Sequence, residues 1–207
     1  MHSKSPLRGA VYASALLLMM AGCGGGGTEP PATSDGGGEI KDGGELRVYI
    51  AEPRHLVSTN TTEAEGGAVA RAIYAGLIDY TGDDYKIVNV HAESITSTDN
   101  KVWTIKLKSG WTFHNGEPVN AESYIRAWNT GAYEPNAHTG SHFFERFEGY
   151  ADLQGKPPKA KEMSGLKKLD EYSFQVTLRQ PFAGFPVTLG YTSYRPMAKA
   201  CADDLKA

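Results

Sequence analysis

The sequence predicts an α/β fold, or an α+β fold with a mixed sheet, for residues 45–207. Segments in which apolar and polar residues alternate, as in half-buried strands, occur at 45–50, 101–108 and 172–178. Between them lie segments with apolar residues three or four positions apart, as in amphipathic helices. Because no internal repeat interrupts this order, we expect one globular domain with its own core.

The first two elements follow a glycine-rich stretch. The alternation at 45–50 predicts a strand with Leu46, Val48 and Ile50 on one face. Thr62 and Glu65 then have the spacing of a capping box, which predicts the start of a helix. We expect this helix to end near Leu77, since its apolar residues recur every fourth position: Val69, Ile73 and Leu77.

The central elements have the clearest pattern. Residues 101–108 predict a half-buried strand with three large side chains inward: Trp103, Ile105 and Leu107. Alternation continues through Trp111 and Phe113 to Asn115-Gly116, a dipeptide that favours a chain-reversing turn. Asn120 then stands where a helix N-cap belongs, before a helix at 121–129 with a defined apolar face: Tyr124, Ala127 and Trp128.

The last third is less regular. Phe143, Phe147 and Tyr150 lie at helical spacing and predict one more helix before the loop at 155–158. Residues 172–178 alternate strictly and predict a strand that Gln180-Pro181 ends.

The N-terminus has the layout of a cleaved export signal. A basic head with His2, Lys4 and Arg8 precedes an apolar run at 10–21, shorter than the roughly 20 residues that span a bilayer. The run ends in Met20-Ala21-Gly22-Cys23, which resembles a bacterial lipobox. We therefore expect a lipoprotein signal peptide at 1–22, lipid on Cys23 and a Gly/Pro-rich tether at 23–44. The alternative is a buried helix at 10–21 with Cys23 packed in a core.

Charge and cysteine content narrow the function classes. The formal net charge is −3, so the composition has no excess of basic residues that would indicate a large cationic surface. We therefore expect no nucleic-acid partner. If Cys23 carries lipid, Cys201 has no cysteine partner in this chain.

Several motifs together indicate a family. The stretch Trp103 to Ser123, including Phe113-His114-Asn115-Gly116, resembles a conserved block of the family 5 extracellular solute-binding proteins, the peptide receptors of ABC importers. Similar matches occur at residues 43–48, 65–67, 73–80, 92–94 and 165–182. Within the third of these, Tyr74-Ala75-Gly76-Leu77 is similar to the family's "Tyr-x-Gly-Leu" exit from its first helix.

The resemblance implies a type II periplasmic-binding-protein fold, of which 45–207 is expected to be an incomplete first lobe. It implies a peptide ligand, an ABC permease and ATPase complex as partner, no enzymatic activity and no cofactor. The lipid would hold the protein, expected to be a monomer, at the extracytoplasmic face of the cell membrane.

The resemblance also suggests ligand contacts. The loop after the family's first strand lines its cleft, and here that loop contains Glu52 and His55. It departs from the family's usual "Ser-Leu-Asp-Pro", which leaves the ligand class open. Tyr191 and Tyr194 are candidates for the cleft wall. For Glu52 the alternative is a solvated loop carboxylate, and for the tyrosines it is ordinary packing.

Two other function classes stay open. His138 and His142 lie four residues apart, as two zinc ligands on one helix face would, so an exported metal-dependent hydrolase is one alternative. Thr139-Gly140 interrupts that helix and no glutamate follows the first histidine, so the His-Glu-x-x-His pattern is absent and we expect no metal site. A structural envelope lipoprotein outside transport would share the signal, the lipid and the tether.

Overall fold

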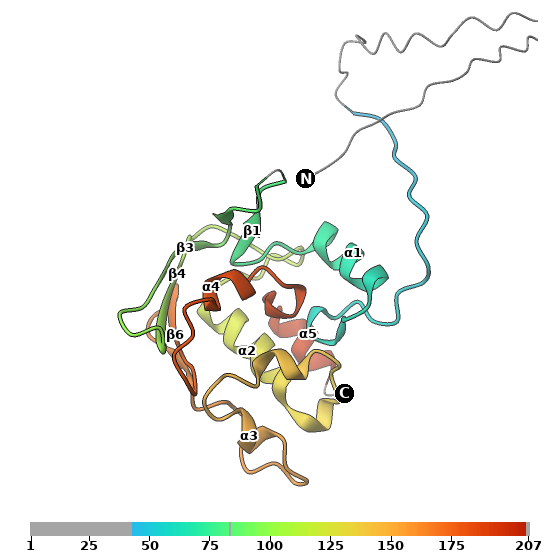
Figure 1. Cartoon of the computed structure of the whole chain (residues 1–207). Helices are drawn as coiled ribbons and strands as arrows, with labels where there is room; N and C mark the ends of the chain where they lie inside the picture. Colours follow the sequence, from blue (N-terminus) through green and yellow to red (C-terminus); the bar gives the residue numbers. More distant parts are fainter. Residues whose placement is uncertain (1–42, 83, 206–207) are drawn as a thin grey trace, which may run out of the picture. The chain divides into compact units, whose positions relative to one another are not determined.

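A four-stranded antiparallel sheet packs against a helix in the computed structural model, which describes residues 43–82 and 84–205 (Figure 1). The sheet has the order β3-β4-β6-β5, formed by β3 (Ala92–Thr96), β4 (Val102–Leu107), β6 (Ser173–Thr177) and β5 (Leu166–Lys168). All pairs among the described strands are antiparallel, so the observed architecture is the α+β form of the predicted class.

The two strands predicted at 101–108 and 172–178 are confirmed as the centre of the sheet. β4 pairs with β6 in a register that places Ile105 opposite Phe174. The predicted inward face of β4 is buried, because Trp103, Ile105 and Leu107 all face the core.

The helix predicted behind Asn120 is confirmed as α2 (Ala121–Ala132), which continues three residues beyond the predicted end. Asn120 and Ser123 form a reciprocal capping box: the Ser123 N–H donates to Asn120 Oδ1 at 3.2 Å, and the Asn120 N–H donates to Ser123 Oγ at 3.1 Å. The cap fixes where the helix begins, and therefore which of its side chains meet the sheet.

Aromatic rings join α2 to the sheet. Tyr124 stacks on Phe174 of β6 with ring centroids 5.8 Å apart, and Trp128 meets Phe174 edge to face at 5.5 Å. Trp128 is fully buried and also contacts Phe147 and Tyr194. This cluster is the centre of the core.

The turn predicted at Asn115-Gly116 is confirmed. Gly116 has φ +85°, a left-handed backbone that glycine adopts without steric cost, and its N–H donates to the Phe113 carbonyl at 2.9 Å. Thr112 pairs with Pro118 across the reversal.

The strand predicted at 45–50 is wrong for the described chain. Residues 43–50 form no helix or strand, and the side chains of Leu46 and Val48 are 87% and 68% exposed. Alternation creates a strand only when a neighbouring strand accepts its hydrogen bonds, and no described strand pairs with this segment. Contacts group the described residues from Val48 onward into one compact unit.

The first predicted helix exists, but its boundaries and buried face differ. It forms as α1 (Ala64–Ile73), and its N-cap is Glu63, so the capping box expected from Thr62 and Glu65 is absent. The residues it buries are Gly66, Gly67 and Ala70, whereas Ile73 is 45% exposed and Leu77 lies beyond the helix end. The face that carries Gly66 is buried because the neighbouring chain packs too closely for a side chain. A Cβ at Gly66 would meet Thr61 Cγ2 at 2.7 Å and the His55 carbonyl oxygen at 2.9 Å.

The helix predicted through Phe143, Phe147 and Tyr150 is two separate pieces. A 3₁₀ turn, η3 (Ser141–Phe144), is followed by a short helix, α3 (Tyr150–Leu153). Gly149 separates them with φ +84°, a backbone conformation incompatible with a continuing right-handed helix.

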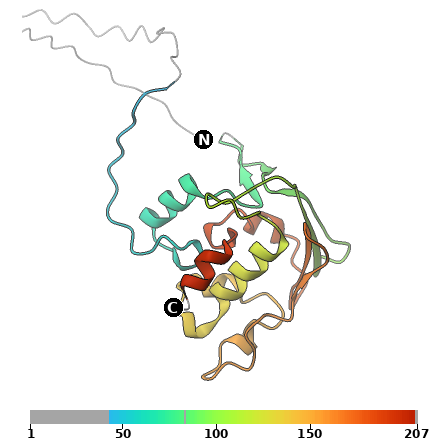
Figure 2. The ribbon, with the colours of Figure 1, turned by 180° about the vertical axis from the view of Figure 1, so that it is seen from behind.

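The remaining elements connect these parts. A hairpin pairs β1 (Ile78–Tyr80) with β2 (Ile87–Asn89). The short helical segments are η1 (Ser58–Asn60), η2 (Glu134–Asn136), α4 (Phe185–Thr188), η4 (Thr192–Tyr194) and α5 (Lys199–Asp204). Figure 2 shows α5, in red, beside α2, where Arg126 Nη1 donates to the Met197 carbonyl at 2.9 Å.

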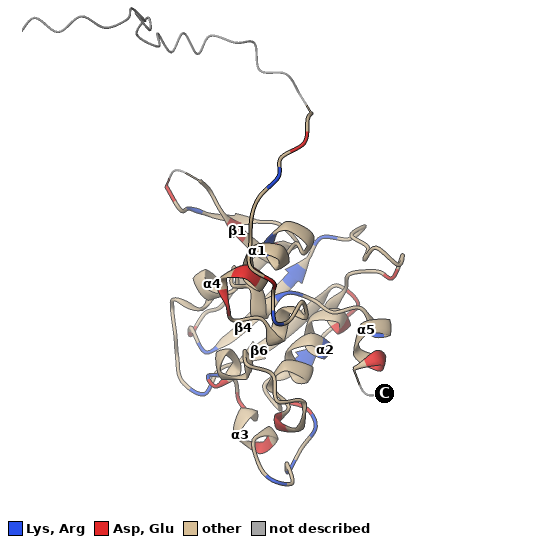
Figure 3. Ribbon diagram, turned by 90° about the vertical axis from the view of Figure 1, so that its right-hand side faces the viewer, with Lys and Arg blue, Asp and Glu red and all other residues tan. Residues whose placement is uncertain are grey.

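Acidic and basic positions are interspersed along the ribbon in Figure 3. None of the helices in the described part is long and apolar enough to cross a membrane. The predicted signal peptide and Cys23 lie outside the described residues.

Candidate functional site

The loop that contains Glu52 and His55 leads into η1. Hydrogen bonds to the segment that follows α2 hold η1 in place. Thr59 is fully buried, and its Oγ1 lies 2.9 Å from Nδ1 of His138. The Gly140 N–H donates to the Thr59 carbonyl at 3.2 Å. Residues 79 positions apart in sequence thus hold η1 against the segment that follows α2.

Asn60 and Thr139 extend this attachment. The Thr139 N–H donates to Asn60 Oδ1 at 2.8 Å, and the Thr139 hydroxyl donates to the Asn60 carbonyl at 2.6 Å. Asn60 and Thr139 are thus joined by two hydrogen bonds, which give η1 a defined position. A binding loop requires a rigid support of this kind.

His138 and His142, considered above for metal binding, form separate hydrogen bonds. Nδ1 of His138 faces Thr59, and Nδ1 of His142 lies 3.0 Å from the Thr139 carbonyl. Burial lowers the pKa of His138 and favours its neutral form. Within residues 43–82 and 84–205, no three His, Cys, Asp or Glu side chains form a group that could hold a metal ion.

Glu52 and His55 are exposed on the loop before η1. The backbone of His55 is anchored, since its carbonyl accepts a hydrogen bond from Thr61 Oγ1 at 2.8 Å. Neither side chain lines the pockets described below, and the structure does not bring either of them together with the two predicted tyrosines.

Tyr191 and Tyr194 do meet, at a pocket of about 370 Å³ that Tyr80, His142 and Phe143 also line. Tyr191 is 38% exposed and stacks on Phe143, with ring centroids 4.2 Å apart. The side chain of Tyr191 is therefore partly accessible to solvent.

Tyr194 has a different environment. Its hydroxyl donates to the Phe143 carbonyl at 2.7 Å, and its own carbonyl accepts from Trp128 Nε1 at 3.2 Å. Burial raises the pKa of Tyr194 to about 12, so the phenol stays neutral. Tyr194 supports the pocket wall, whereas Tyr191 is partly exposed at the same pocket.

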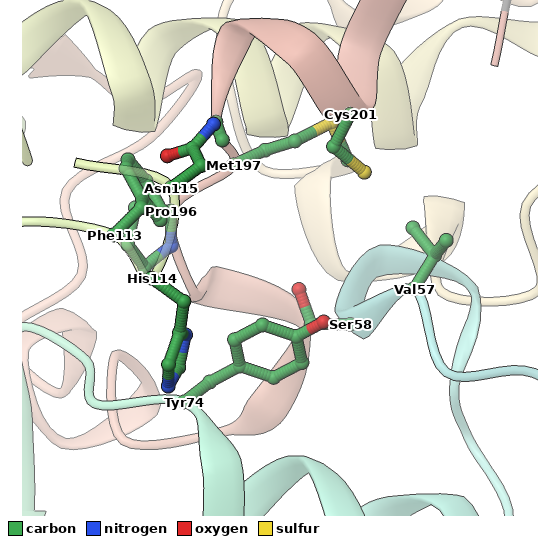
Figure 4. A pocket seen from close by; sticks show the side chains of 10 residues that line it. Val57, Ser58, Tyr74, Phe113, His114, Asn115, Pro196, Met197 and Cys201 are labelled. Atoms are coloured by element: carbon green, nitrogen blue, oxygen red, sulfur yellow. The ribbon is translucent and has the colours of Figure 1, made fainter. Parts of the chain in front are cut away.

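A second pocket, of about 210 Å³, was not predicted (Figure 4). Figure 4 shows Tyr74 and His114 on one side, Met197 and Cys201 on another, and Val57 and Ser58 opposite the His114 backbone. The block at 103–123 signals the turn that carries His114, but nothing local to the sequence indicates that residues 57, 74, 114 and 197 converge.

A third pocket, of about 240 Å³, adjoins the second and shares four lining residues with it: Tyr74, Phe113, His114 and Pro196. His91 forms part of its wall, with Nδ1 2.7 Å from the Tyr124 hydroxyl and its ring centroid 4.6 Å from that of Trp111. Burial, followed by the positive charges of Arg195 and Lys108, lowers the pKa of His91 to about 4. At neutral pH this imidazole is uncharged.

Aromatic and polar side chains line all three pockets, and Glu145 and Arg146 add two charged side chains to the pocket of about 370 Å³. Such linings suit the capture of amphipathic molecules by stacking and hydrogen bonding. Residues 86–206 match the family model described as "Bacterial extracellular solute-binding proteins, family 5 Middle".

The chain belongs to family 5 of the bacterial extracellular solute-binding proteins.

Two curated proteins with similar sequences are binding proteins. The periplasmic oligopeptide-binding protein OppA of Escherichia coli K12 is 27% identical over 171 residues, which cover 75% of this chain and 31% of OppA. The glutathione-binding protein GsiB of the same strain is 30% identical over 119 residues, covering 57% of this chain and 20% of GsiB. The chain therefore spans less than a third of the length of these relatives.

Solved structures agree on the fold. Listeria monocytogenes OppA bound to peptide superimposes with a TM-score of 0.62 at 27% identity, over 70% of this chain and 28% of that one. The murein tripeptide-binding protein MppA of Escherichia coli gives 0.65 at 20% identity, over 72% and 29%. The predicted type II periplasmic-binding-protein fold is thus confirmed.

Proposed function

We propose that this family 5 protein captures peptides outside the cell membrane and delivers them to an ABC permease and ATPase complex. The match of residues 86–206 to the family model carries the proposal, and the likeness to a peptide-bound OppA supports peptides as the ligand class. Capture requires neither a cofactor nor a catalytic group. The aromatic and polar pocket linings fit that role.

We further propose that lipid on Cys23 anchors the protein, as a monomer, to the extracytoplasmic face of the membrane. The basic head, the apolar run and the motif ending at Cys23 support this anchor. A lipid and a flexible tether keep a receptor near its permease and so raise their effective concentration.

Among the ligand contacts, Glu52 and His55 are proposed because they lie exposed on the loop that leads to η1, whose position Thr59 and His138 fix. Tyr191 is proposed because its exposed ring lines the pocket of about 370 Å³, and Tyr194 because it holds the wall of that pocket.

Thermal unfolding tests the capture of peptides. A pool of short peptides is expected to raise the melting temperature, because a ligand bound only by the folded state stabilises it, by about 2.7 kcal/mol at one hundred times Kd. Tyr191→Ala and Glu52→Gln are expected to reduce the shift, whereas Val187→Ala, at another exposed position, is the matched control. An unchanged melting temperature with every peptide contradicts capture, and hydrolysis of the pool indicates an enzyme instead.

Metabolic labelling with palmitate tests the anchor. The native protein is expected to carry label and to sediment with membranes, and Cys23→Ser is expected to lose both properties. Labelling that persists in Cys23→Ser contradicts the assignment.

A further inference from the structure

The pocket of about 370 Å³ described above adjoins another of about 290 Å³. Glu145 and Arg146 line both of them, and Arg179 and Gln180 complete the lining of the smaller one. The larger pocket is rich in aromatic rings, whereas the smaller one is lined by charged and polar side chains. One ligand can therefore contact both.

The register of two chain segments places the two arginines opposite each other. Phe147 pairs with Leu178 in an antiparallel bridge, and the Arg179 N–H donates to the Arg146 carbonyl at 2.8 Å. Phe147 and Leu178 are buried, so the adjacent Arg146 and Arg179 lie on the outer side, where both are exposed. Side chains directly opposite on neighbouring strands have Cβ atoms about 5 Å apart, and like charges in such a pair repel each other.

An anion that bridges the two guanidinium groups offsets this repulsion. A carboxylate suits the position, because its two oxygens accept charge-assisted hydrogen bonds from the planar forks of arginine. The guanidinium carbon of Arg146 lies 4.6 Å from the centroid of the Phe182 ring, a contact that favours one position for this side chain. Glu145 adds one negative charge to the smaller pocket, where the two arginines outnumber it.

The larger pocket suits an aromatic side chain. Tyr191 and Phe143 contribute stacked rings to it, with centroids 4.2 Å apart, and a further ring can pack against them offset or edge to face. The neighbouring charges act on this pocket. Burial raises the pKa of Tyr194, and among the smaller effects Arg146 lowers that pKa and Glu145 raises it.

We propose that the two pockets together select peptides that carry both an aromatic side chain and a carboxylate: the ring enters the pocket of about 370 Å³, and the carboxylate meets Arg146 and Arg179. This inference rests on the proposed function and names the class of peptide. The carboxylate is that of an acidic side chain or of the peptide C-terminus, which share one chemistry. Because both arginines are exposed, the expected selectivity is modest, about two- to fivefold in Kd.

Isothermal titration calorimetry of the 207-residue chain tests this selectivity with three peptides that differ only in their carboxylates. Ala-Phe-Gln-Ala-amide has none, Ala-Phe-Glu-Ala-amide has one on a side chain, and Ala-Phe-Gln-Ala has one at its C-terminus. At least one carboxylate peptide is expected to bind about two- to fivefold more tightly than the first, and the one that does identifies the source. Replacing phenylalanine by alanine in that peptide is expected to weaken its binding.

Substitutions assign the preference to the arginine pair. Arg179→Gln and Arg146→Gln are each expected to abolish the preference, whereas Glu145→Gln is expected to increase it, because it removes a negative charge beside the carboxylate. Arg71→Gln is the matched control, an exposed arginine of α1 that lines neither pocket, and it is expected to keep the preference of wild type. Salt at about 1 M, where the Debye length is about 3 Å, is expected to reduce the preference in wild type.

Equal Kd values for the three peptides overturn this proposal and leave peptide capture standing. A preference that Arg146→Gln and Arg179→Gln both retain also overturns it. If none of the peptides binds, peptide capture fails and this proposal fails with it, so the two failures remain distinguishable.

Discussion

Nδ1 of His91 lies 2.7 Å from the hydroxyl oxygen of Tyr124, inside the junction of the sheet with α2. His91 is 4% exposed, and Arg195 and Lys108 add positive charge around it. Protonating this imidazole in the folded protein is therefore unfavourable, which makes stability depend on pH.

We expect stability to fall as the pH is lowered from about 6.5 to about 4. The folded pKa of His91, about 4, lies below its ordinary value of 6.5, so the unfolded chain binds the proton first and gains free energy in this window. The loss approaches about 3 kcal/mol. Urea denaturation at several pH values measures it.

His91→Gln is expected to weaken this pH dependence, and His114→Gln, at an exposed position, is the control. Buried His138 also has a lowered pKa, so part of the dependence persists. Equal slopes in wild type and His91→Gln contradict the role of His91.

Trp128→Ala is expected to destabilise the protein by about 3–5 kcal/mol, because it removes a fully buried ring from the centre of the aromatic cluster. Trp111→Ala, at a position 41% exposed, is expected to cost much less. Chemical denaturation followed by far-UV circular dichroism compares them, and similar losses would argue against the described core.

Asn120→Ala is expected to cost about 1 kcal/mol, since the Ser123 N–H loses its acceptor at the start of α2. Asn120→Asp keeps an acceptor and is expected to be close to wild type. The urea midpoints of both variants test the cap; equal losses would rule out a role for the acceptor.

Gly140→Ala is expected to cost about 1–3 kcal/mol and to displace η1. Its Cβ would overlap the Thr59 carbonyl oxygen and lie 2.8 Å from Ser193 Oγ, so a buried backbone must shift. Gly67→Ala is the control: its Cβ meets nothing within 4 Å, and alanine is expected to stabilise α1 by about 0.5–1 kcal/mol. Thermal unfolding with and without peptides reports both effects, and a Gly140→Ala variant as stable as wild type contradicts the tight packing.

Elements that depend on residues close in sequence were predicted correctly, whereas those that depend on distant segments were not. Alternation at 101–108 and 172–178 predicted β4 and β6, and Asn120 predicted the start of α2, because each signal depends on residues close in sequence. The same rules failed at 45–50, where no described strand pairs with the segment. In α1, close backbone approach at Gly66 overrides the Val69–Ile73 stripe.

For the candidate site, the sequence by itself determined the family, through the block at 103–123, and proposed a loop and two tyrosines. Only the tertiary structure separated Tyr191, whose side chain is partly exposed, from Tyr194, whose hydroxyl and carbonyl form hydrogen bonds inside the wall. It alone placed Arg195 against Gly76 and joined Thr59 to His138. Periodicity reports which face a residue occupies, whereas pockets and buried charges depend on which distant segments meet, and that is decided when the whole core packs.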